Sequence, residues 1–157
     1  MGILSRFFGK PLKAEVENCI RAAGMVIAVR LARRYGSQYG DESAFALASA
    51  VTNELFGAPP GNEIGRQFLA SNKQLVETQL HALASEPQIC QIVSMLAHTK
   101  CNIAGNTQSV TPEMIMWASK LSDSGILLPV EQVALPKSPD EMRGRIREFE
   151  LWSLQTS

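Results

Sequence analysis

The sequence contains few of the residues that perform most metal and nucleophilic chemistry. It has two histidines and three cysteines, Cys19, Cys90 and Cys101, among 157 residues. An odd number of cysteines without a paired spacing does not predict a disulfide framework and favours a reducing compartment. His98 and Cys101 lie three residues apart and could share a metal, but neither C-x-x-C nor H-x-x-x-H occurs. We therefore predict no metal site and no cofactor.

Long hydrophobic runs are also lacking. The longest, residues 22–29, would form about 12 Å of helix, whereas the hydrocarbon core of a bilayer is about 30 Å thick. The apolar start of the chain lacks the uninterrupted core and the cleavage site of a secretory signal. These absences predict a soluble, cytoplasmic protein without a transmembrane helix.

The chain has no net charge, although its basic and acidic side chains are unevenly distributed. Residues 1–34 carry seven basic and two acidic side chains, and the remainder carries eight basic and thirteen acidic ones. A basic front can steer anionic partners, or it can let the first helices dock onto the acidic remainder. The basic and aromatic cluster in residues 30–39 is short and lacks a recognition motif, so nucleic acid is not predicted as a partner.

Signals for helices occur along nearly the whole chain. Proline or a capping residue precedes most apolar-periodic segments, and glycine follows several of them. The expected helix starts are marked by Asp41, Asn62, Ser85, Thr111 and Ser138, and the segments after Ser85 and Ser138 have the spacing of a capping box. The expected helices are 11–35, 41–56, 62–83, 86–103, 111–125 and 138–154. We predict an all-α fold, a single-domain irregular bundle of about six main helices. Residues 11–157 form the domain, 11–35 is its central helix, and 1–10 form an N-terminal arm.

One stretch, "ILLPVEQVALPK" at residues 126–137, fits neither a helix nor a strand. It is too apolar for an ordinary surface loop, and its two prolines interrupt any helix. We expect a hydrophobic connection that crosses the surface of the bundle and contains one short helical turn.

No catalytic motif is present. Ser94 and His98 are four residues apart and could touch, but a helical serine lacks an oxyanion donor, and no acid that would orient the histidine can be assigned. The segment "GAPPGNEIG" contains two prolines and is not followed by the lysine of a phosphate-binding loop. We assign no catalytic residue, and a non-catalytic protein is favoured over an enzyme.

The opening residues, "MGILSRFFGKPLK", pose the sharpest question about function. In a helix over residues 2–10 the large apolar side chains share one side, with basic side chains around it. Such an arm can fold back onto its own chain or a second copy, bind another protein, or lie on an anionic membrane. Its apolar residues are Ile3, Leu4, Phe7 and Phe8. The candidate contacts with an anionic surface are Arg6, Lys10 and Lys13.

Two further regions are candidates for a protein interface, because each carries large apolar side chains. They are the connection 126–137 and the last helix. Their candidate residues are Leu128, Val130, Val133, Phe149 and Trp152.

The function that these features favour is a helical interaction or regulatory domain in the cytoplasm that binds an unidentified protein. The first alternative is a peripheral membrane protein attached by residues 2–10 to the inner membrane surface. The second is a small-ligand-binding protein or an enzyme with a pocket between helices. For that pocket the residues to inspect are Tyr35, Tyr39, His81, His98 and Trp117. A homo-oligomer is a further expectation for the interaction domain.

Overall fold

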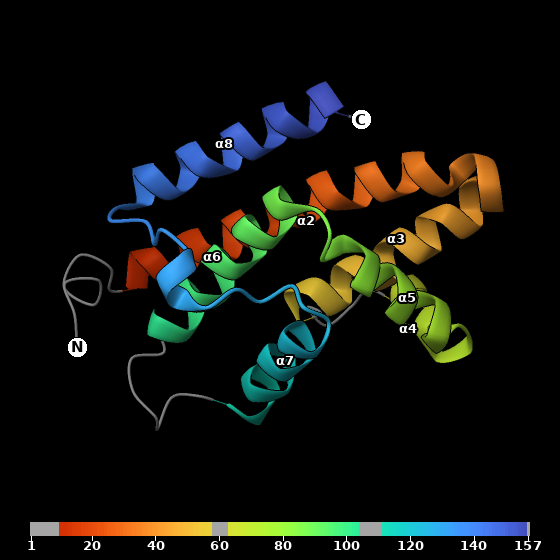
Figure 1. Ribbon diagram of the computed structural model, residues 1–157, viewed down its shortest axis with the longest axis horizontal. Coiled ribbons are helices and arrows are strands. Elements are labelled where there is room, and N and C mark those ends of the chain that lie inside the picture. Colours follow the sequence, from red (N-terminus) through yellow and green to blue (C-terminus); the bar gives the residue numbers. More distant parts are fainter. Residues whose placement is uncertain (1–9, 58–62, 104–110, 157) are drawn as a thin grey trace.

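The computed structural model describes residues 10–57, 63–103 and 111–156, which form a bundle of α-helices with no strand in these ranges (Figure 1). The prediction of an all-α bundle is confirmed. The helices are α2 (Lys10–Tyr39), α3 (Asp41–Phe56), α4 (Glu63–Ser71), α5 (Lys73–Leu83), α6 (Pro87–Ile103), α7 (Pro112–Asp123) and α8 (Pro139–Thr156), with a short 3₁₀ turn, η1 (Val130–Gln132), before α8.

The long helix α2 is central, because α3, α6 and α8 all pack against it. Ion pairs show the directions of these neighbours. Glu15 near the start of α2 pairs with Arg143 near the start of α8, so α2 and α8 run parallel. Glu17 pairs with Lys100 near the end of α6, whereas Arg30 pairs with Glu86 just before α6 begins. Helices α2 and α6 are therefore antiparallel.

Among the described helices, α2 and α3 make the most extensive contact with each other. Gly40, with a φ of 84°, makes the turn between them, a conformation that favours glycine. A Cβ atom added to Gly24 would lie 3.2 Å from the Cγ2 atom of Thr52. The absent side chain of Gly24 therefore lets the two helices approach closely.

The hydrophobic core is built from α2, α3, α5, α6 and α8, together with Trp117 and Leu121 of α7. One face of α2 takes no part in it. Met25 and Val29 on that face are 66% and 42% exposed. Helix α2 is therefore central to the bundle without being enclosed on every side.

The helix expected over residues 62–83 is two helices, which is a correction to the sequence prediction. The helical conformation is interrupted at Asn72, which has a φ of −135° and a ψ of 41°. The side-chain amide of Asn72 donates a hydrogen bond to the carbonyl of Phe68 at 3.1 Å. Asparagine bonds to nearby backbone in this way when it leaves the helical conformation.

The expected helix caps are correct in some places and wrong in others. Thr111 accepts a hydrogen bond from the amide of Met114, and Ser138 accepts one from Glu141. Asp41 is instead the first residue of α3, with Gly40 in the cap position. The hydroxyl of Ser85 donates to the carbonyl of Ala82 and makes no capping box. Asn62 lies outside the described residues.

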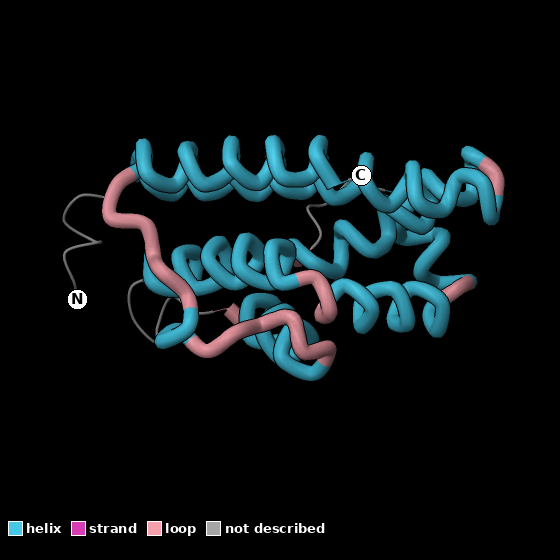
Figure 2. Tube along the Cα trace, turned by 45° about the horizontal axis from the view of Figure 1, so that its top comes forward, coloured by secondary structure: helices cyan, strands magenta, loops and turns pink. Residues whose placement is uncertain are grey.

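The connection 126–137 runs back across one face of the bundle from the end of α7 to the start of α8 (Figure 2). Its single helical turn is η1, as expected. Ile126 is fully buried and Val133 is nearly so. The apolar character of this segment therefore reflects its contact with the core.

Candidate functional site

Ser94 and His98, the residues of the candidate catalytic dyad, both bind the backbone of the 126–137 connection. The Ser94 hydroxyl donates to the carbonyl of Ile126 at 3.1 Å and accepts from the amide of Leu128 at 2.9 Å. The Nε2 atom of His98 lies 2.7 Å from the carbonyl oxygen of Leu128. Because a carbonyl oxygen only accepts, Nε2 donates this hydrogen bond. Both side chains therefore fasten the connection to α6.

The three cysteines lie in surroundings that favour the neutral thiol. Burial raises the pKa of Cys19 to about 11, with a smaller contribution from the nearby Glu15 carboxylate. Burial also raises the pKa of Cys90 and Cys101. Thiols with a raised pKa are poor nucleophiles and poor metal ligands at neutral pH. Within the described ranges, no three His, Cys, Asp or Glu side chains gather where they could hold a metal ion.

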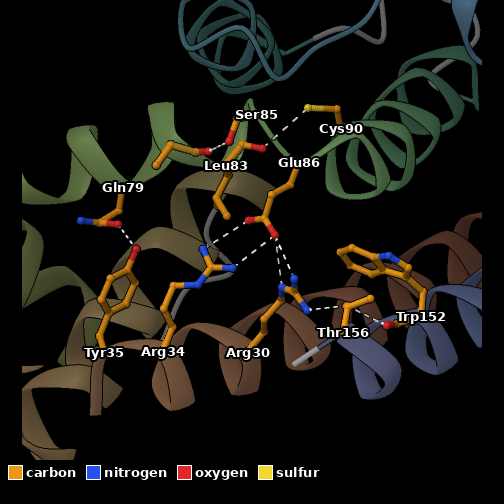
Figure 3. A network of polar contacts seen from close by, with 11 residues as sticks. Arg30, Arg34, Tyr35, Gln79, Leu83, Ser85, Glu86, Cys90, Trp152 and Thr156 are labelled. Carbon is orange, nitrogen blue, oxygen red and sulfur yellow. Dashed lines mark hydrogen bonds and ion pairs between the residues drawn. The ribbon is translucent and has the colours of Figure 1, made fainter. Parts of the chain in front are cut away.

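A polar cluster joins α2 to α8 and to the turn before α6 (Figure 3). The guanidinium of Arg30, only 9% exposed, donates to the carboxylate of Glu86 at 3.0 Å and to the hydroxyl of Thr156 at 3.0 Å. It also lies over the ring of Trp152, 4.5 Å from the centroid. Arg34 binds the same carboxylate, and this hydrogen bond is the main cause of its raised pKa. Every group in the cluster has a partner, so it fastens helices together.

Of the aromatic residues singled out for an inter-helix pocket, Tyr35 and Tyr39 are neighbours on α2, whereas Trp117 has its contacts in another part of the bundle. The hydroxyl of Tyr35 donates to the side chain of Gln79 (Figure 3). The ring of Tyr35 lies 6.0 Å from that of Tyr39. The indole of Trp117 is buried and donates to the carbonyl of Leu55 at 2.8 Å. His81 lines a hollow between α5 and α7, and Trp117 lines a smaller one beside it.

The candidate interface residues differ in their burial. Val133 and Phe149 are 7% and 4% exposed and belong to the core. Trp152 is partly buried and stacks on Phe149 with 5.6 Å between centroids. Leu128 is half-buried, and Val130 is 44% exposed. The arm residues Ile3, Leu4, Arg6, Phe7 and Phe8 lie outside the described residues, as do the side chains of Lys10 and Lys13.

A groove of about 620 Å³ lies between α5 and α7. It exists because α5 and α7 both pack on α3 rather than on each other. Val76 and Leu80 of α5 form an apolar floor and are almost completely buried. Ile115 and Met116 of α7 stand at the opposite side, 57% and 71% exposed. We call this hollow the α5–α7 groove.

Charged side chains surround the α5–α7 groove. Glu54 at its edge is paired with Lys120. Glu77 of α5 and Asp123 of α7 make no ion pair with any described residue. Among the lysines at the edge, Lys73 also makes no ion pair with a described residue. The lining groups therefore leave a small excess of negative charge around an apolar floor.

A smaller hollow of about 210 Å³ extends the groove around Met116. It shares Glu54, Met116 and Lys120 with the groove, and it adds Trp117 and the carboxylate of Glu113. Together the two hollows are lined by four carboxylates against two ammonium groups. The extension therefore increases the negative character of the surface.

Sequence reasoning missed this groove, although α7 contains a signal for it. Residues on a helix are about 100° apart, so the consecutive apolar residues Ile115, Met116 and Trp117 cannot all face one core. Trp117 is the buried member, and the other two are left at the surface. Exposed large apolar residues that line one hollow are typical of binding sites.

Comparisons with known proteins add no further assignment. No protein-family model matches the chain, and no curated protein and no solved structure is significantly similar to it. Among the described helices, none is both long enough and apolar enough to cross a bilayer.

Proposed function

We propose that this protein is a non-enzymatic interaction module of the cytoplasm, and that it binds an amphipathic helical segment of another protein in the α5–α7 groove. The observation that carries the proposal is the exposure of Ile115 and Met116 beside the apolar floor of Val76 and Leu80. Flexible methionine side chains adapt to different partners and are common at surfaces that bind helices. The three free cysteines support a reducing compartment.

The shape and chemistry of the groove favour a helix over a small molecule. Small-ligand sites enclose most of their ligand and place a few convergent polar groups around it. Here one wall is formed by two side chains that are more than half exposed, and the charges stand around the edge. The excess of carboxylates favours a helix whose apolar stripe is bordered by basic residues.

Peptide display tests this proposal. A library of random helical peptides is panned against the full chain, and the enriched peptides are measured by fluorescence anisotropy. We expect apolar residues at helical spacing flanked by Lys and Arg. The Met116→Lys variant should weaken binding about tenfold or more, because a lost apolar contact of about 1.5–3 kcal/mol corresponds to at least that factor.

A matched control is available on another helix. Met25 of α2 is 66% exposed and Met116 is 71% exposed, so Met25→Lys makes the same change on an equally accessible surface away from the groove. Peptide affinity should not change in this variant. Peptides that bind the Met116→Lys protein as tightly as the parent would overturn the proposal.

A further inference from the structure

We infer that two copies of this chain form a symmetric dimer through the solvent-facing side of α2, with their α2 helices antiparallel. This inference goes beyond the proposed function and does not rest on it, because α5 and α7 take no part in the interface. Three observations support it: a group of exposed apolar side chains, the spacing of large and small residues along α2, and opposite charges at the two ends of the surface.

Exposed apolar side chains from three helices lie along the solvent-facing side of α2. Met25 and Val29 belong to α2 itself. Helix α2 lies between α3 and α8 and packs against both (Figure 1). These neighbours contribute Phe45 of α3 and Leu154 of α8, which are both more than half exposed. We call the surface formed by these four residues the α2 face.

Contacts between α2 and α3 place Phe45 on one border of the α2 face. A Cβ atom added to Gly24 would lie 3.2 Å from the Cγ2 atom of Thr52. One added to Gly36 would lie 3.4 Å from a carboxylate oxygen of Asp41. Phe45 precedes Thr52 by two helical turns and therefore lies on the same side of α3. It is level with the part of α2 between Gly24 and Gly36.

Two contacts between α2 and α8 place Leu154 on the other border. Arg143 of α8 pairs with Glu15 of α2 at 2.8 Å. Leu154 follows Arg143 by three helical turns, so it lies on the same side of α8. Thr156 accepts a hydrogen bond from Arg30 at 3.0 Å, which shows that the end of α8 is level with the middle of α2. The exposed apolar residues of the three helices are therefore neighbours, as is typical of an interface.

Large and small residues on the α2 face are spaced so that the face fits a second copy of itself. Positions 22, 25, 29, 32 and 36 follow one another in steps of three and four, which keeps them on one side of the helix. In an antiparallel pair with Met25 opposite Gly36 of the other copy, Val29 is opposite Ala32. Each large side chain then packs against a small residue, and the two-fold axis repeats both contacts.

Charged side chains at the two ends of the α2 face favour the antiparallel arrangement. Arg21 lies at one end, and the carboxylate of Asp41 lies beside Gly36 at the other. Neither Arg21 nor Asp41 makes an ion pair with a described residue. In the antiparallel dimer Arg21 of each copy meets Asp41 of the other, which gives two ion pairs. A parallel dimer would instead bring like charges together, which is unfavourable.

Sedimentation velocity of the full chain at a series of concentrations tests this inference. We expect a dimer for the parent chain. Met25→Lys should raise the dissociation constant about a hundredfold or more, because every dimer loses two apolar contacts at once. Phe45→Lys should also weaken association. Both side chains are more than half exposed, so neither change should disturb the fold, and circular dichroism checks this.

The matched control is Met116→Lys, which makes the same change in the α5–α7 groove. It should leave the dimer intact. A parent chain that stays monomeric at about 100 µM would overturn the inference. A dimer that survives both Met25→Lys and Phe45→Lys would also overturn it, as would a dimer that dissociates only in Met116→Lys.

Charge reversal tests the antiparallel arrangement. Arg21→Glu should weaken association about fivefold or more, because it replaces two attractive contacts per dimer with two repulsive ones. The double variant Arg21→Glu/Asp41→Lys should restore association, since each pair is attractive again. A double variant that associates no more tightly than Arg21→Glu would overturn this arrangement, as would an Arg21→Glu chain that associates like the parent.

The outcome is separable from that of the proposed function. The described residues that line the α5–α7 groove belong to α3, α4, α5, α7 and the turn after α7, so the dimer leaves the groove open. Met25→Lys chains should be monomeric and should keep their affinity for the displayed peptides. Met116→Lys chains should be dimeric and should lose that affinity. Each proposal can therefore fail while the other holds.

Discussion

The guanidinium of Arg30 is enclosed between the carboxylate of Glu86 and the indole ring of Trp152. This places a charged side chain that is only 9% exposed at the junction of α2, α6 and α8. Both partners neutralise or cover the charge. Removing Glu86 would leave the charge of Arg30 buried without its counter-charge, and a buried charge without a partner is strongly unfavourable.

The first prediction follows from this junction. Glu86→Ala should destabilise the fold by about 2–4 kcal/mol, since it leaves the Arg30 guanidinium buried without its counter-charge. Chemical denaturation measures the loss. The double variant Arg30→Met/Glu86→Leu should recover much of the stability, and a double variant no more stable than Glu86→Ala would contradict the explanation.

The second prediction concerns the hydroxyl of Ser94, which bonds to both Ile126 and Leu128. Ser94→Ala should cost about 1–3 kcal/mol, because the buried carbonyl and amide lose their partner. Urea denaturation checks this value. Ser122→Ala on the exposed side of α7 is the control and should change stability by less than about 0.5 kcal/mol.

A pair of glycines gives the third prediction. A Cβ atom at Gly65 would lie 2.5 Å from the Nδ2 atom of Asn53 and 3.1 Å from the backbone of Ser49, whereas one at Gly144 meets nothing within 4 Å. Gly65→Ala should therefore lower stability by about 1–3 kcal/mol. Gly144→Ala should raise it by up to about 1 kcal/mol, because alanine favours the helix. Equal changes in melting temperature would refute the packing of α4 against α3.

The fourth prediction concerns Glu141, whose carboxylate accepts a hydrogen bond from the amide of Lys137 at 2.9 Å. This bond, followed by the interaction with Arg145, lowers the pKa of Glu141 from its ordinary value of 4.5. A lowered folded pKa means that the stabilisation is present above pH 4.5 and is lost as the pH falls through the folded pKa. Glu141→Gln should be less stable than the parent at pH 7, and the difference should shrink as the pH falls below 4.5. A difference that stays constant from pH 7 to pH 3 would show that the carboxylate charge is not responsible.

Local signals predicted most helix positions, because caps, prolines and glycines act through neighbouring residues. Thr111 and Ser138 show this directly, since each hydroxyl accepts a hydrogen bond from an amide three residues along the chain. The break at Asn72 was missed because the apolar periodicity continues through it, from Phe68 to Leu75 and Leu80. Only the local backbone conformation of Asn72 separates α4 from α5.

The α5–α7 groove could not be predicted in the same way. It depends on how α5 and α7 are placed against α3, and that placement is set by contacts between residues far apart in the chain. Trp117, for example, binds the carbonyl of Leu55, 62 positions earlier. The exposure of Ile115 and Met116 follows from this anchoring. Their apolar character was visible in the sequence, but the helix against which α7 packs was not.

The parallel pairing of α2 with α8 has a consequence for synthesis of the chain. These are the first and the last of the described helices, and α8 covers surfaces of both α2 and α6. While the ribosome is still producing α8, the earlier helices lack the side chains of Met142, Ile146 and Phe149 that complete the core. Apolar surface exposed in this way promotes aggregation of nascent chains. A nascent chain that has not yet produced α8 should therefore expose the apolar surfaces of α2 and α6 that α8 covers in the bundle.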